Sequence, residues 1–203
     1  MYRLVFAATL ALFSGQAAFA ATYTLEPNYT QGVLRWDHLG FSFPAAQFAQ
    51  GTGTLEFDAS DPGMASIKVT IPIASLSTGV PDLDEHLKSE DFFEVAKYPT
   101  ATFVSTRVEK GMGVNRFKVT GDLTIRKVTR PVMLEVTLLK VGKNARTEVA
   151  TIGFDAKGTL KRSDFGLGAF VPQVSDEIQL LVTTQAAESK AYTAYLEAQK
   201  AKK

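Results

Sequence analysis

Residues 82–105 read DLDEHLKSEDFFEVAKYPTATFVS and place a short polar helical segment directly before a β-strand. Asp82, with Glu85 three residues later, matches an N-terminal helix cap, in which a side-chain oxygen accepts from a free backbone N–H group. Tyr98 precedes Pro99, and a residue before proline disfavours the helical region of backbone space. We therefore expect the helical turns to begin near Asp82 and to end at Tyr98.

Two adjacent aromatic residues, Phe92 and Phe93, lie on this short element. The residues that follow, 100–108, are β-branched and aromatic and predict a strand. One interpretation is a lid whose rings cover an apolar cavity beside the sheet. The other is that both rings plug an ordinary core, and the residues alone weigh the two evenly.

Outside this stretch, apolar and polar residues alternate with the period of half-buried strands. Turn sequences such as Asp61-Pro62-Gly63 and Gly142-Lys143-Asn144 separate the alternating segments. The predicted antiparallel strands, eight or nine in number, cover residues 23–25, 32–37, 55–57, 67–73, 100–108, 117–125, 132–138, 152–160 and 178–182. The fold class is therefore all-β.

One apolar face per strand suits either a two-sheet sandwich or a single sheet closed into a barrel. Small residues share the apolar faces with large ones at Gly121, Ala150, Ala156 and Gly158, which lets a sheet curl or leaves space inside it. We favour an antiparallel eight-stranded barrel with a short helical lid. Such a barrel is just wide enough to be filled by side chains or to hold one small ligand.

The first twenty residues have the features of a secretory signal peptide. Arg3 precedes an apolar run at 4–13 that is too short to span a bilayer, and residues 18–20 form an A-x-A cleavage site. We expect residues 1–20 to be removed and the protein to be periplasmic or secreted, with no integral membrane span. An uncleaved amphipathic anchor is the alternative.

Charge and cysteine content exclude several classes. Removing Arg3 with the leader leaves 21 basic and 21 acidic side chains, so nucleic acid is not an expected partner. The chain has no cysteine, which excludes disulfides, thiolate chemistry and a lipid anchor on cysteine. A hydrophobic core must hold the domain together.

The last residues, 186–203, change to Ala, Lys, Glu and Gln and predict an appended C-terminal helix. Tyr192, Tyr195 and Leu196 recur at helical spacing. That stripe is either a docking surface or part of a frayed, solvated tail.

Several short motifs together resemble one known family. In order, they are His38-Leu39-Gly40-Phe41-Ser42, Gly53-Thr54-Leu55-Glu56-Phe57-Asp58, Asp84-Glu85-His86-Leu87-Lys88-Ser89-Glu90-Asp91-Phe92-Phe93, Tyr98-Pro99, Ala101-Thr102-Phe103, Ser105-Thr106, Gly121-Asp122-Leu123-Thr124 and Thr129-Arg130-Pro131-Val132. Over residues 23–184 the chain resembles the YceI-like family of secreted lipid- or polyisoprenoid-binding proteins. The resemblance implies one lipocalin-like barrel domain at 21–185, with a helical segment near its mouth and a long apolar tunnel.

The implied cargo is an isoprenoid, an isoprenoid quinone or a fatty-acyl lipid, and the implied cellular roles are handling of such molecules and stress tolerance. Some positions depart from the family pattern. Tyr29 stands where a histidine is usual, Glu26 replaces an aspartate, Leu83 replaces a basic residue and Ala46 replaces a glycine. A headgroup contact made by these positions in relatives would differ here.

Aromatic residues and the two histidines are the candidate ligand-binding residues. They are Trp36, His38, Phe41, Phe43, Phe48, Phe57, His86, Phe92, Phe93, Phe103, Phe117 and Phe154. Each buried methylene contributes about 0.8 kcal/mol, so an isoprene unit yields roughly 3–4 kcal/mol against association costs of about 4–15 kcal/mol. Tight binding therefore needs several isoprene units. A transient contact of the protein with a membrane is a further expectation.

Catalytic and metal chemistry has little support in the residues. His38 and His86 are too few for a zinc site, and no serine lies in a nucleophile elbow. We predict no catalytic residue, no metal and no cofactor other than the bound lipid. Two alternatives remain: an enzyme acting on a lipid-like substrate through His86 and Asp84, and an interaction module with a filled core. In residues 162–166, Arg162 with Asp164 is expected to lock a loop rather than recognise a headgroup.

Overall fold

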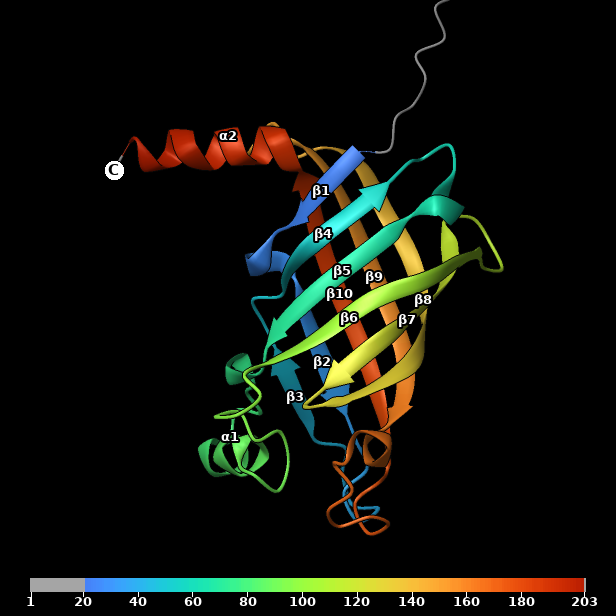
Figure 1. The fold of residues 1–203 in the computed structure, drawn as a ribbon, viewed down its shortest axis with the longest axis vertical. Coiled ribbons are helices and arrows are strands. Elements are labelled where there is room, and N and C mark those ends of the chain that lie inside the picture. Colours follow the sequence, from blue (N-terminus) through green and yellow to red (C-terminus); the bar gives the residue numbers. More distant parts are fainter. Residues whose placement is uncertain (1–20, 203) are drawn as a thin grey trace, which may run out of the picture.

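The computed structural model describes residues 21–202, which form one long antiparallel sheet and two α-helices (Figure 1). The strands are β1 (Ala21–Leu25), β2 (Gln31–Arg35), β3 (Ala45–Phe48), β4 (Thr52–Phe57), β5 (Ser66–Pro72), β6 (Thr100–Lys110), β7 (Arg116–Ile125), β8 (Val128–Lys143), β9 (Ala150–Lys161) and β10 (Glu177–Glu188). The helices are α1 (Pro81–Lys88) and α2 (Ser189–Lys200), with 3-10 turns η1 (Pro27–Tyr29), η2 (Pro62–Met64), η3 (Ile73–Ser75) and η4 (Arg162–Phe165). The expected signal peptide, 1–20, lies outside the described residues.

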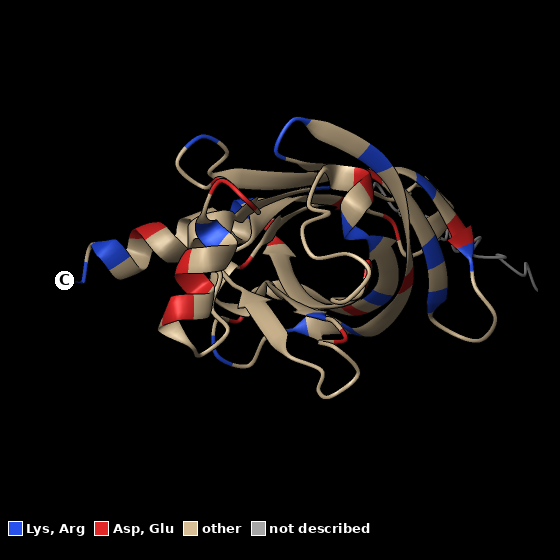
Figure 2. Cartoon of the chain, turned by 90° about the horizontal axis from the view of Figure 1, so that it is seen from below, with Lys and Arg blue, Asp and Glu red and all other residues tan. Residues whose placement is uncertain are grey.

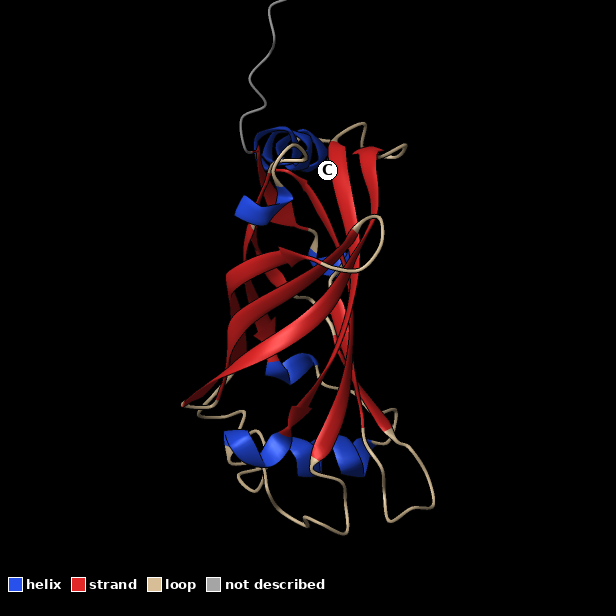
Figure 3. Cartoon of the chain, turned by 90° about the vertical axis from the view of Figure 1, so that its right-hand side faces the viewer, coloured by secondary structure: helices blue, strands red, loops and turns tan. Residues whose placement is uncertain are grey.

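Eight of the strands close into a barrel. Their order is β1-β4-β5-β6-β7-β8-β9-β10, and β10 pairs back with β1 to complete the ring. The predicted eight-stranded antiparallel barrel is therefore confirmed, and the sandwich alternative is wrong. The helices α1 and α2 lie at opposite ends of the barrel axis (Figure 3).

The strands β2 and β3 lengthen the wall on the α1 side. β10 pairs with β1 near Glu188 and with β2 further back, and η1 interrupts the line between β1 and β2. The free edge of β3 is joined to the η3 region because Gln47 N donates to Ser77 O at 2.8 Å and Ser77 N donates to Gln47 O at 2.9 Å. β3 was not predicted. Its sequence, AAQF, carries two alanines and no β-branched residue, although Ala46 and Phe48 are buried on alternate positions.

Glycines on the inner face let the wall curl closely rather than adding empty space. A Cβ added to Gly121 would lie 2.4 Å from the Phe103 ring, and one added to Gly158 would lie 2.9 Å from the Leu134 side chain. The space that a side chain would need is already occupied by the ring and the leucine. Of the two roles weighed for these small residues, Gly121 and Gly158 serve close packing.

The predicted cap of α1 is wrong. The helix begins at Pro81 with Val80 in the cap position, and Asp82 caps nothing. Instead, Asp84 Oδ1 accepts from both the backbone N and the hydroxyl of Thr78, each at 2.6 Å, and these bonds hold the pKa of the Asp84 carboxyl below its usual value. The helix also ends earlier than expected, at Lys88, and residues 89–98 form turns.

The predicted C-terminal helix is confirmed as α2. It continues directly from β10, and the Glu188 carboxylate accepts from the backbone N–H groups of Lys190 and Ala191. The rings of Tyr192 and Tyr195 stack with centroids 6.4 Å apart. Burial raises the pKa of Tyr192, and the charge of Glu26, the residue that follows β1, raises it further.

Candidate ligand cavity

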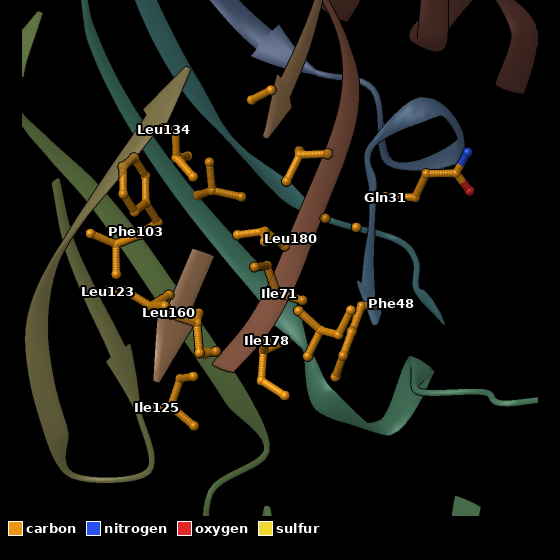
Figure 4. Close-up of a pocket in the computed structure, with 18 of the residues that line it drawn as sticks. Gln31, Phe48, Ile71, Phe103, Leu123, Ile125, Leu134, Leu160, Ile178 and Leu180 are labelled. Atoms are coloured by element: carbon orange, nitrogen blue, oxygen red, sulfur yellow. The ribbon is translucent and has the colours of Figure 1, made fainter. Parts of the chain in front are cut away.

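The inward faces of the strands surround a cavity of about 630 Å³. Figure 4 shows aliphatic and aromatic side chains from several strands converging on it, including Ile71, Phe103, Leu134 and Leu180. Inward positions such as Leu180 are only half-buried although they lie inside the barrel, because the hollow leaves one side of them uncovered. The interior is therefore not packed solid, and the filled-core alternative is wrong.

A compact hydrophobic cluster closes the α2 end of the barrel. It consists of Tyr23, Leu25, Leu55, Phe57, Ile152 and Ala186. Ile152 is fully buried there, and Leu25 is almost so. This cluster forms the floor of the cavity.

The mouth of the cavity lies at the α1 end. Six lining residues are exposed, and five of them gather there. These five, which define the mouth, are His38, Leu39, His86, Phe170 and Gln173; Ser66 is the sixth, near η2. Seen from below, the loops at this end are largely uncharged, whereas acidic residues lie along α1 (Figure 2).

Three rings from two separate segments meet at the mouth. His86 contacts Phe92 edge-on with ring centroids 5.0 Å apart, and Phe92 stacks on Phe170 at 6.4 Å. His86 lies on α1 and Phe92 in the turns that follow it, whereas Phe170 belongs to the loop after η4. All three side chains are part of the cavity lining at the mouth.

Of the two interpretations of Phe92 and Phe93, the lid fits one ring and the core plug fits the other. Phe92 is half-buried in the mouth cluster. Phe93 is buried and packs edge-on against Phe48 with centroids 5.6 Å apart, within the main hydrophobic core. The position of Phe92 suits a lid, and that of Phe93 is a core plug that also contacts the cavity.

Arg162 holds the loop that carries Phe170. Its side chain is only 6% exposed. Its guanidinium donates to four backbone carbonyls: Ser175 at 2.8 Å, Ala169 at 2.7 Å, Val174 at 3.0 Å, and Leu167. Burial lowers the pKa of Arg162, but no neutral form is implied because arginine titrates far above neutrality. The expected loop lock is present.

The predicted partner of Arg162 is wrong. Asp164 is exposed, and the carboxylate that braces η4 is that of Asp176, which accepts from the backbone N of Ser163 at 2.8 Å and from its hydroxyl at 2.7 Å. Burial acts against ionisation of Asp176, but the Ser163 bonds and the charge of Arg162 leave its pKa lowered overall. Asp176 lies outside the 162–166 motif, which is why spacing within that motif pointed to the wrong acid.

Ten of the twelve candidate ligand residues line the cavity. They are Trp36, His38, Phe48, Phe57, His86, Phe92, Phe93, Phe103, Phe117 and Phe154. Phe41 and Phe43 lie outside its lining, in or beside the turn that pairs His38 with Ser42. Phe41 is 90% exposed, and Arg35 lies over the Phe43 ring at 4.8 Å. Ligand contact by each of the twelve stays a prediction.

The predicted ligand-binding residues omit most of the aliphatic lining. Ile71, Leu123, Leu134, Leu160 and Leu180 all face the cavity, and period-two alternation had already placed them on the apolar faces of their strands. A prediction based on aromatic rings and histidines therefore leaves out the aliphatic residues that form much of the cavity wall. Thr30 and Thr184, two buried polar residues of the lining, gave no pattern in the sequence.

The inner end carries these two hydroxyls and a nearby acid. Thr30 Oγ1 and Thr184 Oγ1 lie 2.8 Å apart, and Thr30 Oγ1 donates to the backbone O of Glu26 at 2.9 Å. Glu26 is 2% exposed, and its Oε1 has no hydrogen-bond partner among residues 21–202. Burial raises the pKa of the Glu26 carboxyl, while the charge of Arg146 acts in the opposite direction.

We expect Glu26→Gln to remove a component of the pH dependence of stability. Because the folded pKa of Glu26 lies above the ordinary value of 4.5, the folded state loses stability as pH rises from that value through the folded pKa. Over this pH range the free energy of unfolding of the glutamine variant should rise relative to that of the wild type, by on the order of 1 kcal/mol at neutral pH, because the variant buries no charge. Urea unfolding between pH 4 and pH 8 measures it.

Glu85→Gln, at an exposed position of α1, is the matched control. Equal pH profiles for Glu26→Gln and the wild type would contradict the prediction.

The histidines do not form a recognisable catalytic or metal arrangement. The Asp84 carboxylate is engaged by Thr78, and His86 packs its ring against Phe92. Within residues 21–202, no three His, Asp or Glu side chains gather in a way that could hold a metal ion. Over the same residues, neither helix has the length and apolarity needed to cross a membrane.

The fold and the site together define a closed antiparallel barrel around an apolar internal cavity, which is the architecture of a protein that encloses a hydrophobic molecule. The comparisons agree with this class. The model of the YceI-like domain matches residues 23–186. Protein YceI of Escherichia coli O157:H7 is 35% identical over 181 residues, covering 88% of this chain and 93% of the relative. The chain therefore belongs to the YceI-like family.

Solved structures show the same barrel. BcnA from Burkholderia cenocepacia superposes with a TM-score of 0.68 at 26% identity, covering 77% of this chain and 95% of BcnA. A polyisoprenoid binding domain from Saccharophagus degradans superposes with a TM-score of 0.61, covering 83% of this chain and 99% of that domain. Its identity of 14% makes the second likeness one of fold alone.

Proposed function

We propose that the protein binds one long apolar chain, an isoprenoid, isoprenoid quinone or fatty-acyl lipid, inside its barrel and carries or sequesters it without chemical change. The observation that carries the proposal is the cavity of about 630 Å³ with a wall made mostly of aliphatic and aromatic side chains. A volume of this size is typical of small-molecule sites, and so nearly apolar a wall suits hydrocarbon. The polyisoprenoid binding domain shows that a barrel of this fold can serve such a ligand.

The free energy of burying methylenes favours long chains. Each buried methylene contributes about 0.8 kcal/mol, so a prenyl chain of four units gains roughly 12–16 kcal/mol, which covers most of the range of about 4–15 kcal/mol for the association cost, whereas a chain of two units gains only roughly 6–8 kcal/mol. Chain length is therefore expected to control affinity more strongly than small differences in the wall.

The absence of chemistry is part of the proposal. The candidate acid of the enzyme alternative, Asp84, is held by Thr78, and the candidate base, His86, lies in the ring cluster at the mouth. Family membership also favours a binding protein.

Export and membrane contact complete the proposal. The leader-like residues 1–20 support a periplasmic or secreted location. Leu39, Phe41, Phe43 and Phe170 are exposed hydrophobics at the mouth end, where transient contact with a membrane would let a lipid pass without crossing water.

The test is solvent extraction of the purified mature protein followed by mass spectrometry. We expect a long-chain isoprenoid, quinone or acyl lipid in near-equal molar amount to the protein. After delipidation, the protein should take up geranylgeraniol, a prenol of four isoprene units, and should bind geraniol, a prenol of two units, far more weakly. Recovery of no lipid together with no uptake of prenyl or acyl probes would overturn the proposed function.

A further inference from the structure

The inner end of the cavity differs in chemistry from the rest of the wall. Along β10, the inward residues from the mouth are Ile178, Leu180, Val182 and Thr184, and all four line the cavity. The next inward residue, Ala186, is buried in the floor cluster instead. Thr184 is therefore the last cavity residue on this strand, and it brings a buried hydroxyl to the inner end of a wall that is otherwise apolar along β10.

The directions of two hydrogen bonds follow from a count of protons. A threonine hydroxyl has one proton to donate. Thr30 donates its proton to the backbone carbonyl of Glu26, so in the 2.8 Å contact between the hydroxyls Thr184 must be the donor. Both protons are then in use, and the oxygen of Thr184 retains acceptor capacity. Its hydroxyl can accept a hydrogen bond from a ligand but cannot donate one without breaking its bond to Thr30.

We infer that Thr184 selects a ligand whose polar end carries a hydrogen-bond donor, such as the hydroxyl of a prenol, fatty alcohol or phenol, and that this end enters first and lies at the inner end of the cavity. The inference rests on the proposed function and narrows its ligand class. A ligand with acceptors alone, such as a quinone, an ester or an ether, gains no net hydrogen bond at Thr184 because the existing bond would have to be broken.

The mouth offers no equivalent selection. Its polar residues, His38, His86 and Gln173, are exposed, so a headgroup placed there stays hydrated and gains little from one side chain rather than another. At the inner end, a hydroxyl leaves water completely and must find a partner. Discrimination is therefore concentrated at Thr184.

The experiment compares two probes of equal chain length, geranylgeraniol and its methyl ether, which keeps the oxygen but has no donor. Trp36 lines the cavity and is the one tryptophan of the chain, so its fluorescence reports binding of both probes. The wild type should bind the alcohol roughly 3- to 10-fold more tightly than the ether, the value of one neutral hydrogen bond. Thr184→Val should bind both probes equally, with the affinity for the ether unchanged.

Thr183→Val is the matched control, because it makes the same change at the neighbouring β10 residue, which is not part of the cavity lining. It should keep the preference for the alcohol, and melting curves of all variants check the fold. Thr184→Ser should also keep the preference. Equal binding of both probes by the wild type, or a preference that survives Thr184→Val, would overturn the inference while leaving the proposed function intact. Binding of neither probe would also overturn the inference, and if extraction recovers no lipid and acyl probes are not taken up either, the proposed function falls with it.

Discussion

Replacing Arg162 by methionine is expected to lower the free energy of unfolding by roughly 3–5 kcal/mol. The guanidinium donates to four carbonyls in the stretch from Leu167 to Ser175, and each buried acceptor left without a donor costs roughly 1–3 kcal/mol, less where water can enter. Methionine keeps the length and apolar stem of the side chain but supplies no donor. Urea unfolding followed by circular dichroism gives the measurement.

Two variants sharpen this test. Arg130→Met removes an exposed arginine and should change stability by less than about 0.5 kcal/mol. Arg162→Lys should recover only part of the loss, because an ammonium group has no planar fork of donors to reach four carbonyls. A loss below about 1 kcal/mol for Arg162→Met would show that the loop is held by other contacts.

Replacing Ala156 by tryptophan is expected to weaken binding of geranylgeraniol at least tenfold. Ala156 lies on β9, lines the cavity and is paired with Val136 and Val182 across the two neighbouring strands. An indole at this position fills space that ligand carbons would occupy, and two excluded methylenes already correspond to roughly 1.6 kcal/mol. Uptake of the prenol, measured by extraction and mass spectrometry, avoids interference from the added fluorophore.

The same variant should keep its melting temperature within a few degrees of the wild type, because the new side chain enters an existing void rather than a packed core. Ala194→Trp, on the exposed surface of α2, controls for adding a large ring and should bind normally. Full prenol uptake by Ala156→Trp would contradict a cargo held inside the barrel.

Most of the wall could be predicted because each strand has to present one face to hydrocarbon and the other to water. Residues such as Leu123 and Leu160 show that demand directly in their spacing. β3 escaped prediction because Ala45 and Ala46 carry little strand signal, and its pairing with β2 depends on closure of the wall. The cap of α1 was misassigned because Asp84 bonds to Thr78, six residues earlier, outside the usual capping pattern.

The site was harder to predict than the fold. Spacing suggested that Arg162 locks a loop, but its acceptors are backbone carbonyls that leave no mark on residue type. Thr30 and Thr184 are 154 residues apart and meet only when the barrel is complete. The cavity itself is a property of the assembled strands, and no single residue predicts it.

The pairing of β1 with β10 has a consequence for how the molecule is made. Tyr23 lies opposite Glu188, and β2 also pairs with β10, so the seam that closes the ring joins the two ends of the domain. A seam of such high contact order forms late and slowly, since the intervening chain must be ordered before its ends can meet. Before this seam forms, the apolar inner face of the sheet is exposed to solvent and the edges of β1 and β10 are unpaired. This open form is the one most prone to aggregation.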